Sequence, residues 1–134
     1  MTLVEIKNQI MFQTNNDAED VGDYLPHLID YINEGYDKLV KAWAKTHTGI
    51  GEYDRLEYDT DEPDLPEWTH RALCDWATWL VYRNGNPQKQ QRGYAYRSAF
   101  EEILSQIAGE GGEAGLDENG NLKQYKYFRN IPRG

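Results

Sequence analysis

Apolar residues recur every three or four positions in four segments of this chain, which is the spacing of the buried face of an α-helix. The first segment begins after Thr2 and ends at about Thr14, and Thr2 with Glu5 three residues later matches a capping box. The second segment follows Asp23, a suitable helix cap, and its apolar stripe continues to Trp43. Both segments predict amphipathic helices.

The third and fourth segments are separated by a very short link. Asp64 and Glu67 make a box-like start for the third helix, which ends at the turn signal Asn84–Gly85. Asn86–Pro87 then supplies the cap and the first residue of a fourth helix, which Gly109 closes. The whole pattern predicts an all-α fold, a small bundle of about four helices.

Two regions lie outside this helical pattern. One is a loop over about residues 48–64, within a helical domain that covers residues 1–108. The other is residues 109–134, which open on Gly-Glu-Gly-Gly-Glu-Ala-Gly and predict a flexible linker followed by an extended C-terminal arm. The arm mixes apolar and cationic groups, as is typical of a segment that orders on a partner. Its candidate docking residues are Lys123, Tyr125, Lys126, Tyr127, Phe128, Arg129, Ile131 and Arg133.

Charge is divided unevenly along the chain. The formal net charge is -9, but residues 1–122 carry all 23 acidic residues and ten basic ones, a net charge of -13. Residues 123–134 carry four basic residues and no acidic one, a net charge of +4. The acidic body argues against sequence-independent binding to phosphate backbones, which requires a basic surface.

The acidic residues are densest in and beside the long loop. Eight carboxylates lie between Glu52 and Glu67, with Arg55 as the one basic residue among them. This composition is typical of a solvated loop that its own repulsion keeps away from other surfaces. The alternative is a negatively charged rim or lumen. The residues of such a rim are Glu57, Asp59, Asp61, Glu62 and Asp64.

The sequence offers few candidates for catalysis or metal binding. His70 and Cys74 share one face of the third helix, where an imidazole can activate a thiol, although a lone helical cysteine is more often a small buried apolar group. Glu67 and His70 have the Glu-x-x-His spacing of helical dimetal sites, but those sites need two such motifs. Asp59-x-Asp61 begins like a calcium loop that lacks its glycine. We therefore predict no catalytic, cofactor-binding or metal-binding residue and no enzyme.

A second class of function is nucleic-acid recognition. The short link between the third and fourth helices resembles a helix-turn-helix, and its basic residues are Arg83, Lys89, Arg92 and Arg97. The alternative is a solvated turn, since an acidic body works against docking on DNA. No apolar run approaches the ~20 residues of a membrane span. A single cysteine permits no internal disulfide, and the N-terminal residues do not form a secretory signal, which favours a reducing cytoplasm.

Three stretches of the chain resemble a known family. They are residues 3–7 (LVEIK), residues 30–39 (DYINEGYDKL), and residues 65–68 (LPEW) leading into residues 82–87 (YRNGNP). This pattern is similar to that of the head-tail connector, or portal-adaptor, proteins of long-tailed bacteriophages and prophages. The resemblance covers roughly residues 3–108 and rests on packing and turn signatures. The extended acidic loop and the glycine-linked arm depart from the short members of that family.

The resemblance implies a structural protein of the virion neck, made in the host cytoplasm. Such a protein forms a homo-oligomeric ring, usually a dodecamer, beneath the portal protein, and the next neck protein (a stopper) or a tail terminator assembles on it. DNA passes through the ring without specific binding, and an acidic wall repels it over about a Debye length, ~8 Å at physiological salt.

The resemblance also suggests roles for three groups of residues. The arm docks on the portal, and the acidic loop faces the channel or the downstream ring. Ring contacts are heterologous, so two different faces of each subunit must match. Aromatic side chains that the core does not need are candidates for those faces, namely Trp79, Tyr82, Tyr94 and Tyr96. The alternative function is a helix-turn-helix DNA-binding regulator.

Overall fold

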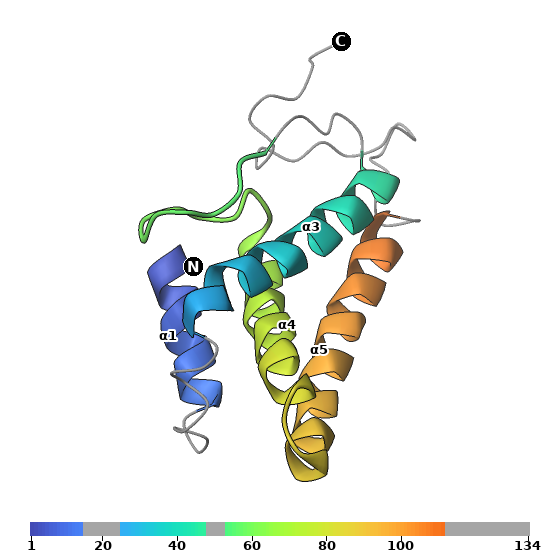
Figure 1. Ribbon diagram of the computed structural model, residues 1–134. Coiled ribbons are helices and arrows are strands. Elements are labelled where there is room, and N and C mark those ends of the chain that lie inside the picture. Colours follow the sequence, from blue (N-terminus) through green and yellow to red (C-terminus); the bar gives the residue numbers. More distant parts are fainter. Residues whose placement is uncertain (15–24, 48–52, 112–134) are drawn as a thin grey trace, which may run out of the picture.

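The chain folds as a small all-α bundle. The computed structural model describes residues 1–14, 25–47 and 53–111. Within these ranges it contains four α-helices and two short 3-10 helices, with no strand (Figure 1). The α-helices are α1 (Leu3–Gln13), α3 (Leu28–Thr46), α4 (His70–Arg83) and α5 (Pro87–Gly111), and the 3-10 helices are η2 (Leu25–His27) and η3 (Glu67–Thr69). The predicted fold class is therefore confirmed.

The predicted cap of α1 is present. The backbone N–H of Glu5 donates to the Thr2 hydroxyl over 3.3 Å, and the Glu5 carboxylate accepts from the backbone N–H of Thr2 over 3.0 Å. These two bonds form a capping box, which satisfies donors that the first helical turn leaves unpaired. At the other end the Thr14 hydroxyl donates to the carbonyl of Ile10. Local sequence signals were sufficient to place this helix.

The start of α5 also agrees with the prediction, and its end does not. The side-chain oxygen of Asn86 accepts from the backbone N–H of Lys89 over 2.9 Å, and Pro87 is the first helical residue. The helix continues past Gly109 to Gly111. A Cβ atom at Gly109 would meet nothing within 4 Å, so this glycine is in open space and does not stop the helix.

The box-like start predicted for α4 is wrong. The helix begins at His70, after the η3 turn, and neither start carries a side-chain cap. The backbone N–H of Asp64 instead donates to the Tyr36 hydroxyl on α3. A tertiary contact therefore replaces the local cap. For the second predicted helix, Asp23 lies outside the described residues, and α3 proper begins at Leu28.

Helix α4 lies at the centre of the bundle. It contacts α1, α3 and α5, and eleven of its 14 residues are buried. Figure 1 shows α4 between α1 and α5, with α3 crossing them. A Cβ atom at Gly35 would lie 3.1 Å from Trp76, and one at Gly93 would lie 2.7 Å from Trp79. Two glycines thus allow α3 and α5 to approach the tryptophans of α4 closely.

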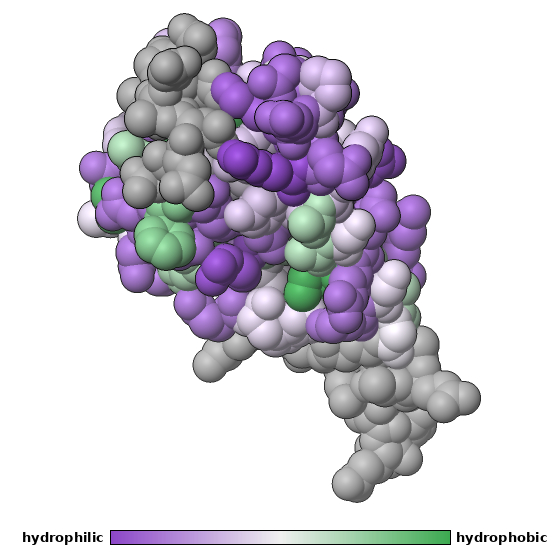
Figure 2. Space-filling view, turned by 90° about the horizontal axis from the view of Figure 1, so that it is seen from below, coloured by the Kyte–Doolittle hydropathy of each residue, from purple (hydrophilic) through white to green (hydrophobic). Residues whose placement is uncertain are grey.

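Figure 2 shows one face of the bundle, which is largely hydrophilic, with small separate apolar patches among the residues drawn in colour. The described helices include none with the length and apolar character that crossing a bilayer demands.

Candidate functional site: the acidic strap

Residues 53–64, here called the acidic strap, lie against the bundle. The strap runs from beside α3 to the first turn of α1, where the carbonyls of Asp61 and Asp59 accept from the backbone N–H groups of Leu3 (2.7 Å) and Val4 (3.2 Å). Backbone N–H groups of a first helical turn have no partner within the helix, so the strap satisfies two of them. The interpretation of this segment as a loop held away from other surfaces is therefore corrected.

Asn33 clamps the strap to α3. Its side-chain amide donates to the carbonyl of Leu56 over 2.9 Å and accepts from the backbone N–H of the same residue over 2.8 Å. The amide also donates to the carbonyl of Ile29. Asn33 and Leu56 are both buried, so water does not compete for these bonds. The clamp fixes the middle of the strap on the bundle.

Two tyrosines hold the ends of the strap. The Tyr36 hydroxyl accepts from the backbone N–H of Asp64 over 2.8 Å, and its ring lies edge-on to Tyr53 with 5.1 Å between centroids. The Tyr53 hydroxyl donates to the carboxylate of Asp37. Burial and this hydrogen bond raise the pKa of Tyr53. Both limbs of the strap are thereby attached to α3.

Asp61 gives the tip of the strap its shape. Its carboxylate accepts from the backbone N–H groups of Glu57 and Tyr58, both over 2.8 Å, and these bonds lower the pKa of Asp61. The carboxylate of Asp59 lies 3.3 Å from the ammonium of Lys7. These two carboxylates therefore have structural partners. Across the described ranges, no group of three or more His, Cys, Asp or Glu side chains is placed to hold a metal ion.

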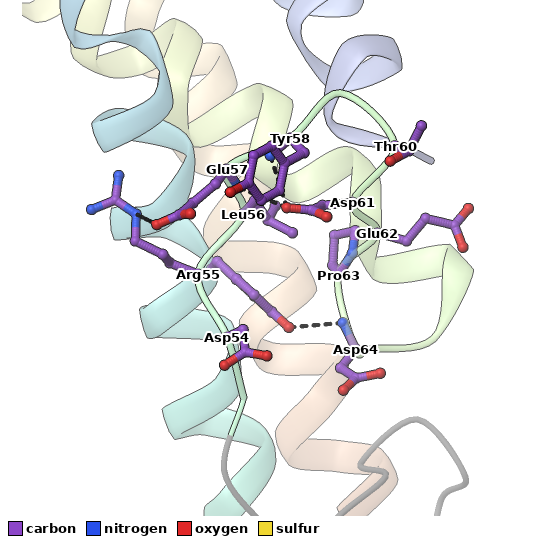
Figure 3. Close-up of a pocket in the computed structure, with 11 residues that line it drawn as sticks. Asp54, Arg55, Leu56, Glu57, Tyr58, Thr60, Asp61, Glu62, Pro63 and Asp64 are labelled. Atoms are coloured by element: carbon purple, nitrogen blue, oxygen red, sulfur yellow. Dashed lines mark hydrogen bonds and ion pairs between the residues drawn. The ribbon is translucent and has the colours of Figure 1, made fainter.

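The strap and Tyr36 enclose a groove of about 630 Å³ (Figure 3). Pro63 and Leu56 are buried beneath it, whereas Tyr58 is 70% exposed. Figure 3 shows Asp54 and Asp64 on opposite limbs of the strap. The carboxylates that line the groove are those of Asp54, Glu57, Asp61, Glu62 and Asp64.

Arg55 is the one basic residue that lines this groove. Its guanidinium lies 3.1 Å from Asp30 on α3 and 4.0 Å from Glu57. The charge of Arg55 is thus shared with a carboxylate outside the groove. Five acidic and one basic lining residues give the groove a formal charge of -4.

His70 and Cys74 do not form a nucleophilic pair. One ring nitrogen of His70 bonds the carbonyl of Leu65 over 2.8 Å, and the other lies 2.8 Å from the amino group of Met1. Burial lowers the pKa of His70. The Cys74 side chain is fully buried, its sulfur lies 3.8 Å from the carbonyl of Ile6, and burial raises its pKa to about 12. Cys74 is therefore a protonated packing group.

The Glu67 carboxylate is also occupied. It lies 2.8 Å from the amino group of Met1 and 3.3 Å from the ring of His70. The hydrogen bond to that amino group is the main cause that lowers the pKa of Glu67. The Glu-x-x-His pair thus joins the start of α1 to the start of α4.

The basic residues near the α4–α5 turn lie on a helical hairpin. Trp76 packs on Phe100 and Trp79 on Tyr94, so α5 runs back along α4 (Figure 1). The guanidinium of Arg97 lies 3.1 Å from Glu101 and above the ring of Trp79. Arg83, Lys89 and Arg92 complete the set that the sequence analysis named. The long side-by-side contact differs from the crossed helices of a helix-turn-helix, which meet at roughly 90–120°.

The four aromatic residues assigned to subunit faces form two stacks. Trp79 stacks on Tyr94, and Tyr82 stacks on Tyr96. Trp79 is 6% exposed and Tyr82 is 3% exposed, so both pack inside the isolated chain, whereas Tyr94 is 48% exposed. Their role in a subunit interface stays a prediction. The predicted docking arm lies outside the described residues.

Asn33 and Tyr36, which hold the strap, are positions in the candidate site that the sequence analysis missed. Both are buried on the apolar face of α3. The available signal was the amide of Asn33 on a face that is otherwise apolar, because a buried amide requires hydrogen-bond partners. Its partner, Leu56, is 23 positions away, and no local pattern points to it.

Comparisons with known proteins found no relative of this chain. No protein-family model matches it, and neither the curated proteins nor the solved structures contain a match.

Proposed function

We propose that the chain is a structural virion neck protein, a head-tail adaptor that forms a ring under the portal. The observation that carries this proposal is the acidic strap, which is fastened to a small helical bundle and presents a cluster of carboxylates to solvent. A surface of fixed negative charge suits the wall of a conduit for DNA, because it repels the polyanion. In the ring, the strap faces the channel or the next neck protein.

The residues behind the family resemblance have structural roles, as expected for a scaffold protein. In the YRNGNP stretch, the Tyr82 hydroxyl donates to the carbonyl of Gln13, and the side chain of Asn84 donates to the carbonyl of Leu80. Asn86 caps α5. These contacts join α1, α4 and α5 at one corner. They support an interpretation of the motif as a rigid turn that could take part in assembly.

Mixing the purified chain with the portal protein of the same virus tests the assignment. We expect a ring of this chain on the portal by electron microscopy, and loss of portal binding when the chain is cut after Leu122. The truncated chain should keep the unfolding midpoint of the bundle, because the described core ends before residue 112. Absence of any complex with the full chain would contradict the proposal.

Charge reversal on the strap tests the conduit. In Glu57→Lys/Glu62→Lys, two exposed carboxylates become cations without loss of a structural contact to α1 or α3. We expect this variant to bind duplex DNA with an affinity that falls as the salt concentration rises, whereas the native chain should not bind it. The control is Glu34→Lys/Glu102→Lys, which makes the same change at exposed positions on α3 and α5. Tight DNA binding by the native chain with a steep salt slope would favour the regulator alternative.

A further inference from the structure

The groove of the acidic strap has the chemistry of a receptor for a short cationic and aromatic peptide. It combines a volume of about 630 Å³ with a mostly polar lining that includes five carboxylates and the ring of Tyr58. The exposed ring of Tyr58 offers a face on which an aromatic or a cationic side chain can stack. Asn33 and Tyr36 hold the strap in place, so the groove exists before any occupant arrives and little ordering is required on binding.

We propose that the C-terminal arm of the same chain, residues 123–134, docks in this groove when the protein is free. The arm carries four cations and no acidic side chain, and the groove has a formal charge of -4. The arm also carries Tyr125, Tyr127 and Phe128, aromatic side chains that can stack on the exposed ring of Tyr58. Charge and aromatic character therefore complement each other on the two surfaces.

The connecting segment gives the arm a wide reach from the end of α5. Eleven residues, 112–122, separate the last described turn of α5 from the arm. A glycine-rich chain of that length has a root-mean-square span of roughly 17–20 Å and a maximum of about 40 Å. Figure 1 shows that α5 ends at the same end of the bundle at which the strap begins. A tether of this kind gives an effective concentration in the millimolar range, so weak contacts are sufficient.

The docking concerns the free chain and does not depend on a portal. A partner that binds the arm must first displace it from the groove, which makes the strap a competitor for that partner. The groove and the partner's binding site thus compete for the arm. The arm leaves the groove when a partner binds it more tightly than the strap does.

A spin label on the arm tests the docking in the full-length protein. The variant Asn130→Cys accepts a nitroxide, and Cys74 stays unlabelled because it is fully buried. We expect the label to broaden the backbone amide signals of Leu56, Tyr58 and Glu62 at low salt, and to leave that of Gly93 sharp. At about 1 M salt, where the Debye length is ~3 Å, the broadening should disappear.

Matched charge variants show whether the groove is responsible. Glu57→Gln/Glu62→Gln removes two rim carboxylates, and each loss should weaken docking by roughly 1.4- to 5-fold. Glu34→Gln/Glu102→Gln makes the same charge change outside the groove and should leave the broadening intact. Broadening that is absent at low salt, or equal in the two variants, overturns the proposal. Broadening between a labelled copy and an isotopically marked, unlabelled copy would assign the groove to a second chain and likewise overturn docking within one chain.

Discussion

The clamp formed by Asn33 makes a quantitative prediction about the strap. In Asn33→Ala, the chain loses two hydrogen bonds to Leu56 and one to Ile29. The N–H and C=O groups of Leu56 are then buried without their partner, at a cost of about 1–3 kcal/mol each if water cannot reach them. Partial relaxation of the strap reduces this, so we expect a loss of about 2–4 kcal/mol in the free energy of unfolding.

Two measurements check this value. With an unfolding entropy of ~2.1 cal/mol/K per residue, the loss lowers the melting temperature by roughly 7–14 °C. Urea unfolding should show a lower midpoint at an unchanged slope, and hydrogen exchange at the Leu56 amide should accelerate more than exchange at α4. The control Asn8→Ala removes an exposed asparagine from α1 and should change the free energy by less than about 0.5 kcal/mol. Native-like stability and unchanged Leu56 exchange in Asn33→Ala would refute the clamp.

Three further predictions follow from the core. Gly93→Ala should destabilise the bundle by about 1–3 kcal/mol in chemical denaturation, because its Cβ would lie 2.7 Å from Trp79. Gly109 is in open space, so Gly109→Ala should stabilise the bundle by about 0.5–1 kcal/mol. Equal effects of the two substitutions would contradict the close approach of α5 to α4. Burial raises the pKa of Asp75, so the folded state binds its proton more tightly than the unfolded state, and ionised Asp75 opposes folding at neutral pH. Asp75→Asn should therefore gain about 1 kcal/mol at pH 7 in thermal melts, with an advantage that shrinks toward pH 4, and an advantage independent of pH would count against this. The Cys74 thiol should react with a thiol reagent only as fast as the protein opens, so rapid modification of the native chain would show that α4 is less buried than described.

Helices were predictable where local chemistry decides them. The Thr2–Glu5 box and the Asn86–Pro87 start are both complete within four residues, and both are present. The predicted start of α4 is wrong because the backbone N–H of Asp64 donates to a tyrosine hydroxyl 28 positions away. A cap that a tertiary contact replaces leaves no trace in a short window of sequence.

The path of the strap could not be predicted from its charge. Counting carboxylates indicates repulsion, but the structure gives some of them partners: backbone N–H groups for Asp61 and an ammonium for Asp59. The packing partners of the aromatic residues of α4 could not be predicted for a different reason. A central helix buries several faces, so Trp79 and Tyr82 have neighbours on α5. Periodicity identifies one buried face, and only the packing shows the others.

The contacts between the strap and the first turn of α1 have a consequence for the order of folding. They join Leu3 and Val4 to carbonyls more than 50 positions along the chain, whereas the α4–α5 hairpin closes over a link of three residues. Closing a long segment costs more chain entropy than closing a short one, so the hairpin should form early and the seam between α1 and the strap should form last. The same seam should be the first to open, which would separate the amino-terminal helix from the strap while Asn33 still holds the strap on α3.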